Sequence, residues 1–194
     1  MAELKDIDSS LVTVGQPTDG GCAWVCFGKP AKLPTDATTK MSTLTDYVSL
    51  GDISENGFTE SNARTKNKFK NWGGSTILTS ISDEENTYKV EFVETSRPAV
   101  AKLRYGSGSI EVGTDGSVSH IKGVIGTDEQ VSLVIDELES NGFLRRTVIP
   151  VATIDSFDDV PHQKGSLLVY GMTFTAVKGE GNVFDIYRAK PAEA

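Results

Sequence analysis

A strict alternation of apolar and polar side chains between Asn86 and Glu94 is the feature that most constrains the fold. Tyr88, Val90 and Phe92 recur at every second position, with polar residues between them. A period of two places the apolar side chains on one face of an extended chain, which is typical of a half-buried β-strand. This segment is therefore expected to pair within a sheet that covers a core on one face.

The same signals recur along the chain and predict a mainly β protein. Glycine-rich turns separate many short apolar runs, and Asp115-Gly116 and Asn141-Gly142 are typical of hairpins. Pro150 predicts a bulge or an edge position, and residues 155–159 an acidic turn. The sum is about eight to ten strands in a β-sandwich or barrel. The predicted strands lie near residues 22–27, 46–53, 75–82, 86–94, 110–112, 118–125, 129–139, 143–154, 168–176 and 183–187.

One short helix is expected over about residues 96–105. Ser96 can cap its start, Pro98 fits its first turn and Gly106 can end it. A helix of two to three turns is too short to be stable alone, so we expect it to flank the sheet and pack on it.

Length and composition favour one domain over residues 1–194, with a polar N-terminal arm (1–20) and a polar C-terminal tail (189–194). No Pro- or Ser-rich linker divides the chain, and 38% of its residues are hydrophobic. No apolar run approaches the roughly 18 residues of a membrane-spanning helix, so we expect no membrane insertion. The first residues lack the apolar segment of a secretory signal, which favours synthesis in the cytoplasm.

The residues that carry common chemistry are sparse. Three residues separate Cys22 from Cys26, and His120 and His162 are distant in sequence. A structural metal site needs four ligands, so we expect buried or reduced thiols rather than metal ligands. Neither a G-x-S-x-G nor a G-x4-G-K-[ST] motif occurs, and residues 155–159 do not match a calcium loop. We therefore expect a protein that is not an enzyme and uses no cofactor or metal.

A long polar stretch, residues 54–74, separates two of the predicted strands. Its few apolar residues follow no period of 2 or of 3.6, so we expect a loop. Loops of this length are usually functional or disordered, and disordered segments are poor in aromatic residues such as Phe58, Phe69 and Trp72. The stretch therefore predicts a loop that is mobile in a free subunit and becomes ordered between subunits, mainly between stacked rings of them.

Charge also distinguishes this stretch from the rest of the chain. The protein has 19 basic and 27 acidic residues, a net charge of −8. Within residues 56–74, four basic residues accompany the single acidic Glu60, which gives +3 there and −11 elsewhere. A basic segment on an acidic body suits docking on a copy of itself. Nucleic-acid binding is the alternative, which the overall acidity disfavours because phosphate contacts need a basic face.

Six motifs follow one another in an order found in a known family. They are Gly51-Asp-Ile-Ser-Glu-x-Gly57, Trp72-Gly-Gly74, Leu78-Thr-Ser80, Thr87-Tyr-Lys-Val-Glu-Phe-Val-Glu94, Leu144-Arg-Arg-Thr-Val-Ile-Pro150 and Tyr170-Gly-Met-Thr-Phe-Thr175. As an ordered set they resemble the major tail proteins of long non-contractile-tailed bacteriophages, especially those that infect actinobacteria. The tube protein of a contractile injection or secretion system, which shares the fold, is a related possibility. The Trp72 and Leu144 motifs favour the non-contractile family.

The resemblance implies a structural protein of the virion tail with a β-sandwich tail-tube fold. It implies homohexameric rings that stack into a tube through which genomic DNA passes. The implied partners are other copies of the chain, the tape measure, the tail terminator and the baseplate initiator. The charge of −11 outside the long loop fits a tube wall that repels DNA and lets it slide.

The alternative function from another class is a β-sandwich module that binds carbohydrate on a virion or cell surface. Such a module needs a concave aromatic platform, whereas the aromatic residues here are only 8% and scattered. For the tail interpretation, the candidate inter-subunit contacts are basic and aromatic residues of the long loop. They are Phe58, Arg64, Lys66, Lys68, Phe69, Lys70 and Trp72. The three lysines alternate, so an extended conformation would turn them to one face.

Overall fold

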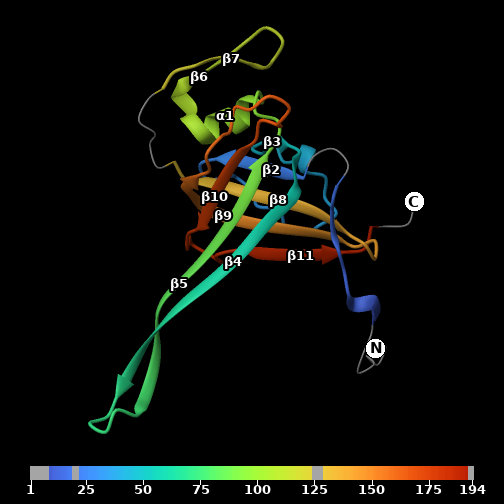
Figure 1. Ribbon diagram of the computed structural model, residues 1–194. Coiled ribbons are helices and arrows are strands. Elements are labelled where there is room, and N and C mark those ends of the chain that lie inside the picture. The colour runs from blue at the N-terminus through green and yellow to red at the C-terminus, as the bar shows by residue number, and fades with distance from the viewer. Residues whose placement is uncertain (1–8, 19–21, 124–128, 192–194) are drawn as a thin grey trace.

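The computed structural model describes residues 9–18, 22–123 and 129–191 and confirms the mainly β prediction (Figure 1). Nine strands form one antiparallel sheet, in the order β3-β2-β8-β9-β10-β5-β4, with β1 also beside β8 and β11 beside β9. A separate ribbon contains β6 and β7. The strands are β1 (Gly15–Pro17), β2 (Ala23–Phe27), β3 (Val48–Gly51), β4 (Ile53–Lys70), β5 (Thr76–Phe92), β6 (Ile110–Val112), β7 (Val118–Ile121), β8 (Val131–Glu139), β9 (Leu144–Phe157), β10 (Tyr170–Ala176) and β11 (Asp185–Ala189).

The sheet curls until its two edge strands meet. β3 ends at Gly51 and β4 begins at Ile53, so the single residue Asp52 joins opposite edges of the sheet. Across this junction the Val93 N–H donates to the Asp52 carbonyl at 3.3 Å. Gly51 has a φ of 78°, a left-handed conformation that side chains resist, so a glycine suits this sharp passage.

The main core fills the inside of the curled sheet. Tyr88, Val90 and Phe92 of β5 are fully buried there, which confirms the face that their alternation predicts. The rings of Phe92 and Phe174 meet edge to face with centroids 6.4 Å apart. Burying large apolar side chains from both halves of the sheet is the main source of stability in such a fold.

A smaller core on the other face of the sheet holds down the segment between β2 and β3. Cys26, Tyr47 and Val148 belong to it, and the Tyr47 hydroxyl lies 2.8 Å from that of Ser132. Arg146 of β9 also holds this segment in place, because its guanidinium donates hydrogen bonds to the carbonyls of Asp36 and Thr39. As the sequence predicts, Cys26 and Cys22 are buried free thiols.

The short helix α1 (Pro98–Tyr105) confirms the predicted helix, although its first residue differs. Arg97, not Ser96, occupies the N-cap position and makes no capping bond through its side chain. Ser96 instead accepts a backbone hydrogen bond from Val118 of β7 at 3.0 Å, because the β6–β7 ribbon packs beside the helix. Gly106 ends the helix as predicted, with a φ of 87°. Three 3-10 turns complete the helical segments: Ser9–Leu11, Met41–Thr43 and Ser107–Ser109.

The bulge predicted at Pro150 is present. Val131 pairs with Ala152 and Leu133 with Ile149, so two residues of β9 lie opposite one residue of β8. Past this bulge β9 exchanges β11 for β10 as its other neighbour. The acidic turn predicted over residues 155–159 is wrong in its first half, because β9 continues to Phe157 and pairs there with Met172.

Within the predicted N-terminal arm, β1 pairs with the end of β8. Residues 1–8, 19–21 and 192–194 of the predicted terminal segments lie outside the described residues, as do 124–125 of the strand expected over 118–125.

Candidate functional site: an exposed β-arm

The prediction of a long loop over residues 54–74 is wrong, because most of this stretch is strand β4. It pairs with β5 almost to the turn, and the strands predicted separately at 75–82 and 86–94 are the two halves of β5. Apolar periodicity could not reveal the strand, because from Glu85 outward both faces of the ribbon are exposed and neither requires apolar side chains. We call residues 62–86 the arm and residues 66–82 the outer arm.

The arm projects from the body as a twisted two-stranded ribbon (Figure 1). At its base the Asn62 amide donates to the side chain of Asn86, and further out Arg64 Nη2 lies 2.9 Å from Glu84 Oε1. From Asn62 to Lys70 the strand advances about 26 Å at the usual rise per residue. The tip of the arm therefore lies far from the body of the same subunit.

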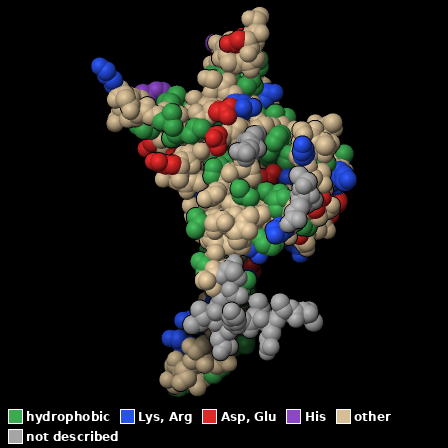
Figure 2. All heavy atoms as spheres, turned by 90° about the vertical axis from the view of Figure 1, so that its right-hand side faces the viewer, with side chains coloured by type: hydrophobic (Ala, Val, Ile, Leu, Met, Phe, Trp, Pro, Cys, Tyr) green, Lys and Arg blue, Asp and Glu red, His purple; other side chains and the backbone are tan. Residues whose placement is uncertain are grey.

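The lysines of the candidate set lie on one strand of the outer arm at alternate positions. Lys66 is opposite Ile81 and Lys68 is opposite Thr79, so the strand period places these two on the same face. A register irregularity separates Phe69 from Lys70. Among the described residues, none of the three lysines makes an ion pair within 4.0 Å. Figure 2 shows Lys and Arg side chains in blue on the arm below the body.

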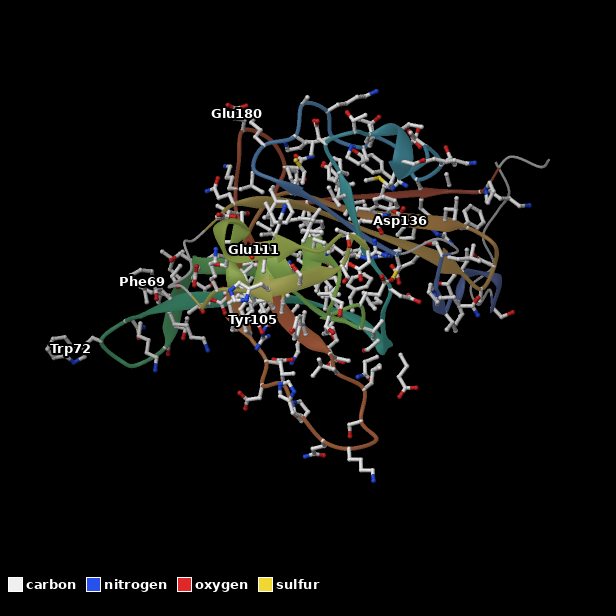
Figure 3. The ribbon with its side chains drawn as sticks, turned by 90° about the horizontal axis from the view of Figure 1, so that it is seen from above. Phe69, Trp72, Tyr105, Glu111, Asp136 and Glu180 are labelled. Carbon is white, nitrogen blue, oxygen red and sulfur yellow. The ribbon has the colours of Figure 1, made fainter. Side chains whose placement is uncertain are left out.

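The outer arm also exposes large apolar side chains. Phe69 pairs with Leu78 across the ribbon, yet each keeps at least half of its surface in water, at 50% and 59%. Trp72 is fully exposed and points away from the protein at the end of the turn (Figure 3). Among the described residues, nothing covers these large apolar side chains, which indicates an interaction site.

The turn that carries Trp72 is well defined by hydrogen bonds. The Asn71 N–H donates to the Ser75 carbonyl at 2.9 Å, and the Asn71 side-chain oxygen accepts from the Ser75 N–H at 2.9 Å. Gly74 takes the left-handed conformation that closes the turn, with a φ of 83°. The indole is therefore presented from a fixed backbone rather than from an irregular loop.

The structure does not bring all seven candidate residues together. Phe58 lies near the root of β4, opposite Val90, and packs on the main core of its own subunit. Arg64 pairs with Glu84 on the neighbouring strand. The other five residues all lie between Lys66 and Trp72 in the outer arm.

Sequence reasoning missed three exposed residues of the outer arm on β5. Ile77, Leu78 and Ile81 are 67%, 59% and 55% exposed, which adds apolar area beside the lysines. It also missed Asp83, Glu84 and Glu85, which lie opposite residues 63–65. Charge on the arm is therefore graded, with acidic residues near the root and only lysines on the outer arm. Ile77 and Ile81 lie within the strand predicted at 75–82, so that prediction already included these two residues.

A charged cluster ties the root of the arm to the body. Arg145 of β9 lies between two carboxylates, with Nε 3.4 Å from Glu137 Oε2 and Nη2 4.0 Å from Glu60 Oε2. Glu60 belongs to β4 and Glu137 to β8, so the cluster spans strands that are far apart in the sheet order. Burial raises the pKa of Glu137 above its ordinary value, an effect that Arg145 opposes. This cluster supports the position of the arm and shows no catalytic arrangement.

The described residues contain no group of three or more His, Cys, Asp or Glu side chains arranged to hold a metal ion. In the part of the chain that the structure covers, no helix has the length and apolar character needed to cross a membrane.

Comparison with known proteins gives little further guidance. No family model and no curated protein matches this sequence. Among solved structures, a chain in the six-fold symmetrised baseplate of the anti-feeding prophage is similar over 93% of this chain and 100% of its own length. The identity is 11% and the TM-score is 0.40. A likeness of this degree decides neither the function nor the assembly of the present chain.

Proposed function

We propose that this chain is a structural protein of a bacteriophage virion that assembles with copies of itself into the tail tube. The ordered sequence motifs and the mainly β fold support the proposal. In this role the protein forms homo-oligomeric rings, hexameric in the family that the sequence resembles, which stack around the passing DNA. The other tail proteins that the resemblance implies would bind at the ends of the tube and within it.

The observation that carries the proposal is the outer arm. A two-stranded ribbon is at best marginally stable in water. In the part of the chain that the structure describes, no residue covers the exposed side chains of Phe69, Trp72, Ile77, Leu78 and Ile81. Burying aromatic and aliphatic groups of this size against a second chain stabilises an interface by several kcal/mol, of order 1.5–3 per side chain. The arm therefore fits a protein whose working state is an assembly.

The shape of the subunit favours open-ended growth. Because the arm extends far from its own body, it can reach a different surface on the next copy. A contact between unlike surfaces is heterologous, and it generates closed rings or continuing filaments. The +3 charge of the outer arm against the acidic remainder gives such a contact its direction.

The carbohydrate-binding alternative gains no support from the arrangement of aromatic residues. The exposed phenylalanine and tryptophan side chains of the described chain are Phe69 and Trp72 on the arm and Phe157 at the end of β9. They lie on separate parts of the molecule and do not form one platform.

Electron microscopy of the concentrated, purified protein tests the proposal. We expect rings or tubes by negative stain and a fast-sedimenting species by analytical ultracentrifugation. Replacing Lys66, Lys68 and Lys70 together with Glu should abolish assembly, because the outer arm then carries the same charge sign as the body. The far-ultraviolet circular dichroism should not change, since all three side chains are exposed.

A matched variant separates position from charge. Replacing Lys164, Lys178 and Lys190, which are exposed on the body, with Glu makes the same change in net charge away from the arm. This variant should still assemble. A parent protein that stays monomeric at high concentration, or an arm variant that assembles as well as the body variant, would contradict the proposal.

A further inference from the structure

We infer that the outer arm of one copy docks by inserting Trp72 into an apolar groove on the body of a second copy. This inference rests on the proposed function and names the surface that receives the arm. The groove has a volume of about 520 Å³. Its apolar wall contains Pro30, Leu33, Val131, Pro150 and Val151, and its rim carries Glu180 and Asp185.

The groove exists because of the bulge in β9. At Pro150 and Val151 strand β9 changes neighbours. The pairing with β11 ends at Val148, opposite Asp185, and the pairing with β10 starts at Ala152, opposite Ala176. Pro150 also has no N–H to offer, which leaves this part of the wall apolar. The loop of residues 179–182 closes one side without filling the space.

Trp72 suits the groove in size and in availability. An indole buries about 150–250 Å² when it enters a pocket, and pockets of about 300–1,000 Å³ accept groups of this size or larger. Large aromatic anchors in central pockets contribute most of the binding energy of typical interfaces. The fixed turn holds the indole in position, which lowers the entropy lost on docking.

The arm cannot fill the groove of its own subunit. Figure 3 shows Trp72 at the tip of the arm. Glu180, on the rim of the groove, lies on the body, far from Trp72. The hydrogen-bonded ribbon between them does not provide a hinge. A second copy can supply the occupant, since each copy carries both an arm and a groove.

Charge on the rim supports this occupant. Glu180 pairs with Lys29 at 2.9 Å, and the two side chains are 90% and 78% exposed, so water already solvates the pair. Asp185 accepts a hydrogen bond from Asn182 at 2.8 Å. Lysines of the outer arm can approach these carboxylates while Trp72 enters the groove. Lys66, Lys68 and Lys70 have no competing acidic residue on the outer arm.

A second groove, near the root of the arm, fits an indole less well. Asp52, Glu55 and Glu137 contribute to its lining, together with Gly15 and Gln16 of β1. Its wall is divided about equally between polar and apolar surface, whereas the wall beside Pro150 is mainly apolar. Burying an indole against carboxylates would remove their water without supplying enough hydrogen bonds.

Site-directed cross-linking tests the docking directly. The variant Gly73→Cys, Gly181→Cys places one thiol beside Trp72 and another in the groove, and leaves the indole in place. Neither glycine has a positive φ, and a Cβ at Gly181 meets no atom within 4 Å. Because each copy carries both thiols on different surfaces, a short bismaleimide should give a ladder of dimers, trimers and longer covalent chains on a denaturing gel.

The control variant is Gly73→Cys, Ser166→Cys, which moves the second thiol to an exposed loop away from the groove. It should assemble without the ladder. Native Cys22 and Cys26 are buried and should react in neither variant. In a Trp24→Phe background, the emission of Trp72 should also shift to shorter wavelength on assembly.

The outcomes distinguish the two proposals. Assembly without a groove ladder, or with Trp72 emission unchanged from that of the free subunit, would overturn the docking inference and leave the tube function standing. Equal ladders from the groove and control variants would also overturn it. Failure of the parent to assemble under all conditions would overturn the proposed function, and the docking inference with it.

Discussion

Replacing Arg146 with Met is expected to lower the free energy of unfolding by about 3–5 kcal/mol. The Arg146 side chain is only 4% exposed and its partner Asp136 is 16% exposed. Its guanidinium donates to both carboxylate oxygens of Asp136, at 2.7 and 2.8 Å. It also donates to the carbonyls of Asp36 at 3.0 Å and Thr39 at 2.9 Å. Methionine leaves a buried carboxylate and two carbonyls without these partners.

The size of this loss follows from burial rather than from bond length. Arg64 and Glu84 approach each other just as closely, at 2.9 Å, but their side chains are 53% and 40% exposed. Water replaces the arginine in an exposed pair, so Arg64→Met should cost less than about 1 kcal/mol. A domain of this kind is stable by about 5–15 kcal/mol in total, so the Arg146 substitution should remove a substantial part of that stability.

Urea denaturation of the unassembled subunit, followed by circular dichroism, measures both variants under the same conditions. The double variant Arg146→Met, Asp136→Leu should recover part of the loss, because it removes the orphaned carboxylate as well. An Arg146→Met loss no larger than that of Arg64→Met would refute the reasoning. So would a double variant less stable than the single one.

Three further predictions concern single groups. Burial raises the folded-state pKa of Glu137 above its ordinary 4.5, so the folded protein binds this proton more tightly than the unfolded chain does. The stability of the parent should therefore fall as the pH rises through the folded-state pKa of Glu137. In urea titrations Glu137→Gln should gain stability relative to the parent from pH 4 to pH 7, and an opposite trend would contradict this. Gly51→Ala should lower the midpoint of urea denaturation more than Gly142→Ala. Both glycines have a positive φ, but only at Gly51 would a Cβ lie 2.2 Å from Glu94 Oε1. Equal losses would show that backbone strain alone decides. Burial raises the pKa of Cys22 to about 11, so this thiol should resist iodoacetamide at pH 8 until the protein is unfolded, and rapid labelling of the native protein, located by peptide mass spectrometry, would be inconsistent with that burial.

The sequence predicts best those elements that have one buried face. Tyr88, Val90 and Phe92 alternate because the core selects every second side chain of β5, and the same pressure makes α1 visible through its buried Val100 and Leu103. Pro150 and Gly142 are recognisable because their backbone chemistry restricts where they can occur. These signals are local and each has a single physical cause.

The arm could not be predicted in the same way. From Asn62 and Asn86 outward to the turn, the two strands of the arm are held by pairing with each other. A backbone hydrogen-bond ladder places no demand on side-chain polarity. The candidate lysines were identifiable because charge is visible in composition, whereas their neighbours Ile77 and Ile81 need the register to be known. The groove beside Pro150 could not be predicted either, since the segment after β2, strand β9 and the loop before β11 meet only in the folded chain.

The continuity of β4 and β5 from core to arm gives the protein an adjustable spacer. Removing two residues from each strand of the outer arm would shorten it by about 6.6 Å and keep every remaining side chain on its original face. Removing one residue from each strand would turn the side chains beyond the deletion to the opposite face. In the proposed assembly, the distance between neighbouring copies could thus change in steps of one strand repeat, while the residues that form the core stay the same.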